Sequence, residues 1–342
     1  MKQLLLLFNF IIFSSITFAQ TVGGNAAFSF VTQPNAAKLS ALGGVNISAI
    51  GNDVSLGFQN PALLRSGMQQ QVNASFNNFL AGIKNYSLTT SFYADKPAIN
   101  LGFGVNYLNY GMITQTDAIG NIYGTFSPND YVVQVMASKQ YKDRFWLGAT
   151  LKYISSSYGQ YKSNGIATDI GLTYYDTSNQ LQISLVAKNI GTQIKTYSNS
   201  GLKEELPFDI QVGITKKLAK APIQLSLTAH HLQQLVISYN DSSFNAAEGN
   251  DSQNKNLLHK TLSHIVVASQ FFVGDKLEIA AGYNFLRGQD LSAYNVSNSL
   301  NGFTMGVCVK LKKLHISYAS GFYQRNFFHQ ISLNFNWKGT DL

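Results

Sequence analysis

The sequence predicts an all-β fold: a fourteen-stranded antiparallel transmembrane β-barrel, preceded by a short, partly helical plug segment. Three observations predict this fold. Apolar and polar residues alternate over repeated segments, the connections between these segments alternate in length, and the chain begins with an export signal. The composition agrees, because charged residues make up only 12% of the chain, against about 25% in soluble domains.

The stretch 99–109 shows the repeated unit. Apolar residues such as Leu101 and Phe103 alternate there with small or polar residues such as Asn100 and Gly102. Alternate side chains of an extended strand point to opposite faces, so one face of this strand is apolar and the other is small or polar. A segment of this length crosses a membrane as a tilted strand.

Fourteen segments carry this pattern, and an even number is what a single-chain bacterial barrel needs. The expected strands are 70–80, 82–94, 98–109, 129–141, 144–156, 165–175, 179–190, 207–218, 222–236, 260–272, 276–286, 301–311, 313–322 and 327–337.

The connections give an independent argument for the barrel. From the second expected strand onward, short turns alternate with long connections, and the first and last hairpins break this rhythm. The long connections are 110–128, 157–164, 191–206, 237–259 and 287–300. Short inner turns and long outer loops follow when both termini lie in the periplasm. A soluble β-sandwich has no reason to alternate so regularly.

Residues 1–19 are expected to be a cleaved secretory signal. They combine the basic Lys2, an apolar run and a small residue, Ala19, before the cleavage point. Asn9 and Ser14 interrupt the apolar run, which argues against a membrane anchor. The expected organisation is a signal peptide at 1–19, a plug segment at 20–69, a barrel at 70–337 and a tail at 338–342.

The plug segment is expected to contain two short helical pieces. Residues 34–44 favour a short helix that Gly43 and Gly44 end. Asn60 and Pro61 indicate a turn that enters the second piece, since proline is tolerated in the first helical turn. Wall side chains alone do not fill the lumen of a fourteen-stranded barrel, so this segment is expected inside or beneath the barrel.

Few residues suggest chemistry. His315 and Ser317 are two apart in an expected strand and share a face, as the base and nucleophile of a membrane phospholipase do. That face is the polar one, so lumen lining is the favoured interpretation and lipid hydrolysis the alternative. The single cysteine, Cys308, is interpreted as a space-filling side chain. His230 and His231 are adjacent in an expected strand, so we expect them to point apart and not to share a metal ion.

No catalytic residue, cofactor or metal site is therefore expected. The net charge of +8 is scattered without a dense run of Lys and Arg, which argues against nucleic acid as a partner of an exported chain. Two non-enzymatic functions compete on this reasoning: a plugged scaffold, and a gated transporter for apolar ligands.

Two groups of residues carry a resemblance to a known family. They are Gly23, Gly24, Phe28, Phe30, Pro34, 37–44 and 60–64 before the first expected strand, and 109–111, 116–117, 120–121, 124–126 and 130–131 after the third. Together they resemble the PorV–PorQ family of outer-membrane barrels from the type IX secretion system, over the full length of the chain. The Asn60-Pro61-Ala62 turn alone is shared with the wider FadL-like barrels, the long-chain fatty-acid transporters. Lys38 departs from the family, where arginine is expected.

The resemblance implies a FadL-like, fourteen-stranded barrel without catalysis or cofactor. Its implied role is to hold the surface protein PorZ at the outer membrane. PorZ works there with the sortase-like PorU and the related barrel PorV in an attachment complex that joins secreted cargo to anionic lipopolysaccharide. The alternative is a FadL-like transporter of a hydrophobic small molecule.

The resemblance also suggests roles for particular residues. Structural roles in the plug fall to Pro34, Leu42, Gly43, Gly44, Asn60, Pro61 and Ala62, and partner docking to Tyr110, Gly111, Asp117, Gly120 and Asn121. The outer loops 110–128 and 237–259 are the longest, so we expect them to carry most of the contact with the partner.

Overall fold

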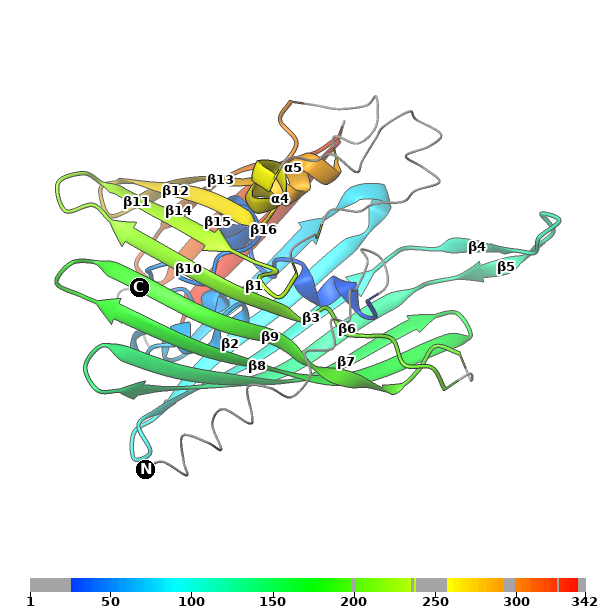
Figure 1. The fold of residues 1–342 in the computed structure, drawn as a ribbon, viewed down its shortest axis with the longest axis horizontal. Helices are drawn as coiled ribbons and strands as arrows, with labels where there is room; N and C mark the ends of the chain where they lie inside the picture. The colour runs from blue at the N-terminus through cyan, green and yellow to red at the C-terminus, as the bar shows by residue number, and fades with distance from the viewer. Residues whose placement is uncertain are drawn as a thin grey trace.

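The computed structural model describes residues 26–198, 201–234, 237, 257–291, 299–324 and 326–337. Within these residues, fourteen strands form one closed antiparallel barrel, and two further strands form a separate hairpin (Figure 1). None of the described helices has the length and apolar content needed to span a membrane. The predicted signal peptide and C-terminal tail lie outside the described residues.

The ring closes because β1 pairs with strands on both sides. Ser75 of β1 lies opposite Ser87 of β2 on one side and Ser332 of β16 on the other. The barrel strands are β1 (Gln71–Asn78), β2 (Lys84–Ala94), β3 (Ile99–Asn109), β6 (Asn129–Tyr141), β7 (Phe145–Tyr158), β8 (Tyr161–Asp176), β9 (Leu181–Lys195), β10 (Asp209–Lys217), β11 (Ile223–Ala229), β12 (Ile265–Val273), β13 (Leu277–Asn284), β14 (Phe303–Lys310), β15 (Leu314–Tyr323) and β16 (Asn326–Asn336). Each of the fourteen expected segments overlaps one of these strands, so the predicted fold is confirmed.

Several expected boundaries were wrong for local reasons. Residues 260–263 belong to a helix, α4 (Leu257–Ser263), and residues 285–286 begin another, α5 (Phe285–Asp290). The Asn284 side chain caps α5 by accepting a hydrogen bond from the backbone N–H of Arg287 at 3.0 Å. The expected long loop 157–164 is a tight hairpin, because β7 and β8 extend until Tyr158 pairs with Tyr161.

The wall has the expected two faces. Large apolar side chains point outward and are exposed, among them Leu88, Leu101, Leu151, Ile170, Leu185 and Val212. The inward positions are mostly polar and buried, among them Thr89, Asn106, Gln134, Thr173, Gln211 and Ser332. A soluble protein does not leave such a continuous apolar outer surface in water, whereas a lipid-facing barrel requires it.

The two ends of the barrel differ. We call the end that carries the short connections the short-turn end, and the opposite end the long-loop end. At the long-loop end, β4 (Ile113–Thr116) and β5 (Ile122–Phe126) form a hairpin that continues β3 and β6 and projects well beyond the wall (Figure 1). Residues 110–128, expected as a loop, are therefore largely an ordered ribbon.

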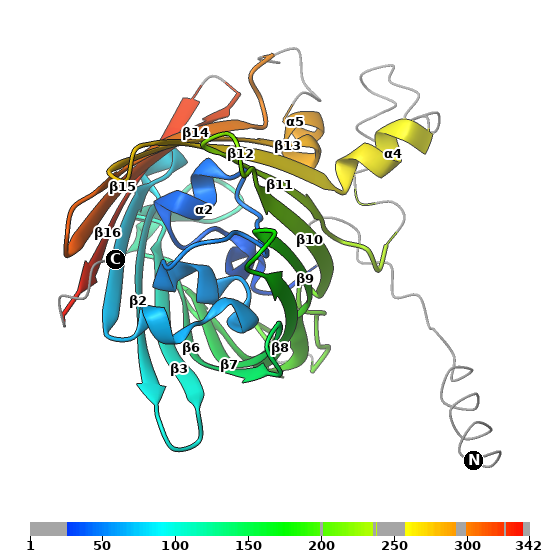
Figure 2. The same ribbon diagram turned by 90° about the vertical axis from the view of Figure 1, so that its left-hand side faces the viewer.

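The segment 26–69 fills the lumen, as Figure 2 shows in a view along the barrel. It contains η1 (Ser29–Thr32), α2 (Ala37–Ala41), η2 (Val54–Phe58), η3 (Pro61–Leu63) and η4 (Ser66–Met68), so the expected short helical pieces are present. The described chain starts at the long-loop end, where the N–H of Ala27 donates to the carbonyl of Glu205 at 2.8 Å. The described chain ends at the short-turn end, where the N–H of Trp337 donates to the carbonyl of Gln70 at 3.1 Å.

Candidate functional site

The first plug turn packs directly against wall backbone. Gly43 and Gly44 end α2 with φ angles of 87° and 85°, a left-handed conformation that favours glycine. The N–H of Gly43 donates to the hydroxyl of Thr304 at 3.1 Å. A Cβ on Gly282 of β13 would lie only 2.3 Å from the nitrogen of Gly43 and 2.5 Å from the carbonyl carbon of Leu42. Glycine is thus needed on both sides of this contact.

The second plug turn is held in the same way. The Asn60 side chain accepts from the N–H of Ala62 at 2.9 Å, and donates to the carbonyl of Ile47 at 2.8 Å. Pro61 occupies the first position of η3. A Cβ on Gly148 of β7 would approach the nitrogen of Ala62 to 2.3 Å. The motif residues of 60–62 therefore form a buried plug–wall contact.

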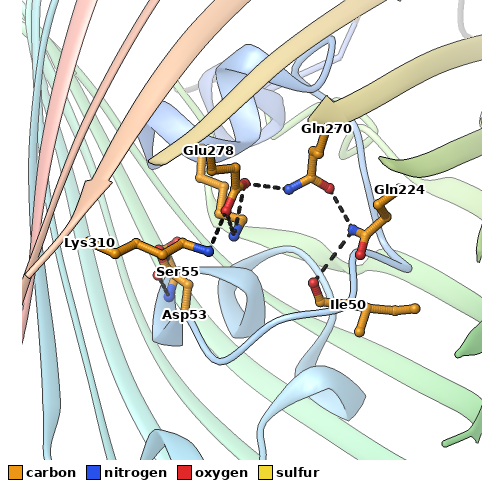
Figure 3. Close-up of polar contacts among 8 residues, drawn as sticks. Ile50, Asp53, Ser55, Gln224, Gln270, Glu278 and Lys310 are labelled. Atoms are coloured by element: carbon orange, nitrogen blue, oxygen red, sulfur yellow. Dashed lines mark hydrogen bonds and ion pairs between the residues drawn. The ribbon is translucent and has the colours of Figure 1, made fainter. Parts of the chain in front are cut away.

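A charged network joins the plug to the wall near the short-turn end (Figure 3). Glu278 of β13 lies 3.4 Å from the Lys38 ammonium of α2 and 3.0 Å from the Lys310 ammonium of β14. Gln270 donates to the same carboxylate, and Gln224 donates to Gln270. The Glu278 side chain is only 2% exposed, so both lysines compensate a buried charge. Lys38 thus has a partner in the wall that could not be predicted from the sequence.

A second buried ion pair lies where the wall is irregular. The register between β8 and β9 shifts near Asp169, because Lys188 and Asn189 together oppose this one residue. The Asp169 carboxylate lies 2.7 Å from the Lys152 ammonium, and it accepts from the N–H of Asn189 at 2.8 Å. Polar side chains therefore fill this bulge.

Two cavities open at the long-loop end. The first, which we call the aromatic cavity, has a volume of about 440 Å³ and is lined by Phe28, Phe30, Tyr110, Tyr158, Tyr161 and Tyr197 together with Asp130 and Glu204. The hydroxyl of Tyr158 donates to Asp130 at 2.8 Å, and Tyr110 donates to the same oxygen. Burial and the hydrogen bond with Asp130 raise the pKa of Tyr110. Tyr110, expected to dock a partner, is half-buried and lines this cavity instead of facing outward.

The second cavity, which we call the polar cavity, has a volume of about 370 Å³ and lies between the plug and the wall. Lys188, Asp209, His230, His231 and Arg287 contribute charged or titratable groups to its lining. The expectation that His230 and His231 point apart was wrong. β11 ends at Ala229, and His231 adopts a left-handed φ of 55°, which brings the two ring centroids within 4.8 Å. Burial, followed by the nearby His231, His264 and Arg287, lowers the pKa of His230 to about 3.

The hairpin β4–β5 carries the remaining motif residues at its tip. Asp117 accepts from the N–H groups of Ile119 at 3.0 Å and Asn121 at 2.8 Å, and Gly120 has a φ of 94°. Hydrogen bonds from Asn121, above all, hold the pKa of Asp117 at about 2. Asp117, Gly120 and Asn121 therefore form the turn itself. The side chains next to them are the ones exposed to solvent.

Those displayed side chains are large and apolar. Ile119 is 88% exposed, Ile122 is 73% exposed and Tyr123 is 68% exposed. Because the hairpin projects beyond the wall, these residues lie outside the apolar belt of the barrel (Figure 1). Gly111 follows the end of β3 and has a φ of 79°. Its N–H donates a hydrogen bond to the side-chain oxygen of Asn109 at 2.7 Å, which fixes a tight turn. Of the other expected contact loop, 237–259, residues 238–256 lie outside the described part of the chain.

The residues considered for lipid hydrolysis line the lumen. His315 is 8% exposed and Ser317 is 4% exposed, both on the inward face of β15, while the neighbouring Ile316 points outward. Cys308 lies opposite Ser317 on β14 and is buried without a disulfide. A pair in this position has no route to lipid through the wall.

Comparison with known proteins relates the chain to solved structures. No protein-family model matches the chain, and no curated protein matches it. A TodX deltaS2S3 mutant, a monoaromatic hydrocarbon channel, aligns over 88% of this chain and 99% of its own, with a TM-score of 0.54 and 11% identity. The CymD monoaromatic hydrocarbon channel gives 0.47 at 13% identity, covering 90% and 97%, and a FadL homologue of Pseudomonas aeruginosa gives 0.46 at 9%, covering 89% and 98%.

At these identities the likeness establishes the fold and no more. The chain has the barrel fold of the TodX channel, with the lumen occupied by its own N-terminal segment. The buried charges were not identified as sites from the sequence. One signal was present for Glu278: it falls on the inward parity of its strand, between Leu277 and Ile279. A charge there needs a partner, which the sequence did not reveal.

Proposed function

We propose that this protein is a non-enzymatic outer-membrane barrel that anchors a surface protein through its projecting hairpin. The observation that carries the proposal is the hairpin β4–β5, which presents Ile119, Ile122 and Tyr123 beyond the barrel wall. Large apolar side chains that neither lipid nor the protein itself covers suit burial against a protein partner. An ordered ribbon also loses less entropy on binding than a free loop of the same length.

The sequence resemblance suggests which partner this is. We propose a surface protein like PorZ, within an attachment complex that includes proteins like PorU and PorV and acts on cargo destined for lipopolysaccharide. In this arrangement the short-turn end and the end of β16 face the periplasm, and the long-loop end faces outward. The sequence also predicts a periplasmic N-terminus, whereas the first described residue, Ala26, lies at the long-loop end.

The filled lumen supports anchoring over transport. Plug residues such as Leu39, Leu42 and Leu56 are fully buried, and the inward wall around them is mostly polar. A transporter for apolar ligands needs a continuous apolar path, and the polar bulge at Asp169 does not provide a lateral opening of that kind. A structural plug, by contrast, needs the dense hydrogen bonding observed here.

The test is affinity capture from gently solubilised outer membranes. We expect a surface protein to co-purify with the wild type, and to be lost from the cell surface when Ile119 and Ile122 are both replaced by Ser. Leu202→Ser is the matched control, because Leu202 is 78% exposed in a different outer connection. Full retention of every surface protein by the double variant, with a folded barrel, would refute hairpin anchoring.

Uptake of a hydrophobic small molecule is the second candidate. The aromatic cavity at the long-loop end favours it, since six aromatic rings surround a space of about 440 Å³. The barrel likeness to the TodX channel is compatible with it. Liposomes containing the purified protein separate the two functions: accumulation of an aromatic hydrocarbon beyond that in empty liposomes supports transport, and equal accumulation supports anchoring.

A further inference from the structure

Three potential metal ligands meet at the outer ends of β10 and β11. Asp209 begins β10, and His230 and His231 follow the end of β11. One ligand atom from each of these side chains lies within 4.8 Å of the others. The ring Nδ1 of His231 is 3.7 Å from Oδ1 of Asp209. This cluster lies outside the plug contacts and the projecting hairpin described above.

The backbone explains why two adjacent histidines converge. In a continuing strand their side chains would point to opposite faces. The left-handed φ of 55° at His231 ends the strand and turns its ring towards that of His230. The N–H of His231 donates to Asp209, and the ring of His264 bonds the carbonyl of His230 at 2.8 Å, so the turn is fixed from both sides.

A second observation points to a ligand. The Nε2 atom of His230 is buried and has no hydrogen-bond partner, in a residue that is only 2% exposed. A buried polar atom without a partner destabilises the folded protein unless a ligand or water satisfies it. His230, His231 and Asp209 all line the polar cavity, which has room for an ion and water.

We propose that Asp209, His230 and His231 bind one divalent transition-metal ion of the zinc type. Two imidazole nitrogens and one carboxylate oxygen are a ligand set of open zinc sites, which leaves a fourth position for water from the cavity. Ligand atoms around tetrahedral zinc lie about 3.4 Å apart, so small side-chain rotations close the observed spacing. Gln211 donates to the other oxygen of Asp209 at 2.6 Å and orients the carboxylate, as outer-sphere partners of metal sites do.

The ion would cross-link two strand ends at the root of the connection that follows β11. Lys188 and Arg287 line the same cavity, and their positive charges repel a metal cation. An anion or hydroxide in the fourth position would offset this repulsion, so we expect one there. The proposal is independent of the anchoring function, because it concerns other residues and another element of the long-loop end.

The experiment is zinc titration of the purified full barrel in detergent, prepared without a histidine tag and stripped with a chelator. Calorimetry should show one saturable equivalent of zinc. Asp209→Asn and His231→Asn should each weaken binding at least tenfold. Asparagine is chosen at 231 because it tolerates a left-handed φ. His259→Asn, at an exposed histidine of α4, is the matched control and should bind as the wild type does.

A spectroscopic measurement makes the result independent of variant folding. Zinc K-edge absorption of the wild-type complex should show two imidazole ligands and at least one oxygen ligand. Retention of the folded barrel by each variant is checked by its faster migration on an unheated gel. The proposal fails if the wild type shows no saturable binding, if both site variants bind normally, or if His259→Asn removes the binding.

Discussion

Replacing Gly282 by Ala tests whether the plug and the wall are held together by direct backbone contact. The added Cβ would lie 2.3 Å from the nitrogen of Gly43, 2.5 Å from the carbonyl carbon of Leu42 and 2.9 Å from the α-carbon of Gly43. All three are backbone atoms, so no side-chain rotation relieves the overlap. The plug turn must retreat by about 1 Å to restore ordinary contact, which is the kind of strain that overpacking creates.

The magnitude follows from three effects. Overpacking costs about 1–3 kcal/mol, and the upper end applies because backbone has to move. The retreat also weakens the hydrogen bond from Gly43 to Thr304, at a further cost of about 1 kcal/mol. Alanine also lowers the conformational entropy of the unfolded chain, which offsets about 0.4–1 kcal/mol of this loss in stability. We expect a net loss of about 3 kcal/mol, or about 150-fold in the folding equilibrium.

Gly102→Ala is the matched control. Gly102 also points into the lumen, but the two closest atoms to its added Cβ would be side-chain ends, those of Met136 at 2.9 Å and Leu64 at 3.0 Å. Both side chains can rotate, so the free energy of unfolding should stay within about 0.5 kcal/mol of the wild type. Urea unfolding in lipid vesicles, followed by the fluorescence of Trp146 and Trp337, measures both variants. Equal losses in the two variants, or no loss in Gly282→Ala, would refute the backbone-contact argument.

Three further substitutions test the buried charges and the hairpin tip. Lys152→Met leaves the 0%-exposed Asp169 carboxylate without its cation and should lower the free energy of unfolding by about 3–5 kcal/mol in the same urea assay; an unchanged midpoint would contradict this. Glu278→Gln leaves two cations facing each other and should cost about 2 kcal/mol, again read from the urea midpoint. The pKa of Asp117 is depressed to about 2, so its support of the turn is complete above the ordinary carboxyl pKa and is lost as the pH falls through 2. The amide resonance of Ile119 should titrate at that pH and stop doing so in Asp117→Asn.

The sequence was sufficient for the wall of the barrel. Period-two alternation of apolar and polar residues depends only on neighbouring positions, and a lipid-facing surface makes this alternation strict. Segments such as 99–109 could therefore be assigned as strands from the sequence. Some strand ends were misplaced because a single side chain or φ angle ends the strand. Asn284 starts a helix by capping it, and His231 turns the chain by adopting a left-handed conformation. Neither effect appears in the spacing of apolar residues.

Contacts across the lumen were beyond the reach of sequence patterns. Lys38 and Glu278 lie 240 positions apart, and each alone looks like an isolated charge. Their pairing depends on how deep the plug sits and on which strand it faces. Gly43 and Asn60 lie in turns of the plug, but their wall partners Thr304, Gly282 and Thr173 could not be identified without the structure.

The position of the plug constrains the order in which the molecule assembles. The N–H of Ala37 donates to the hydroxyl of Ser332, at a sequence separation of 295, and Gln71 pairs with Asn336 where the ring closes. The chain passes through the lumen from one end to the other, so it has to be in place before the first and last strands join. Such distant contacts form late and slowly. We therefore expect the seam between β1 and β16 to close after the plug has entered the lumen.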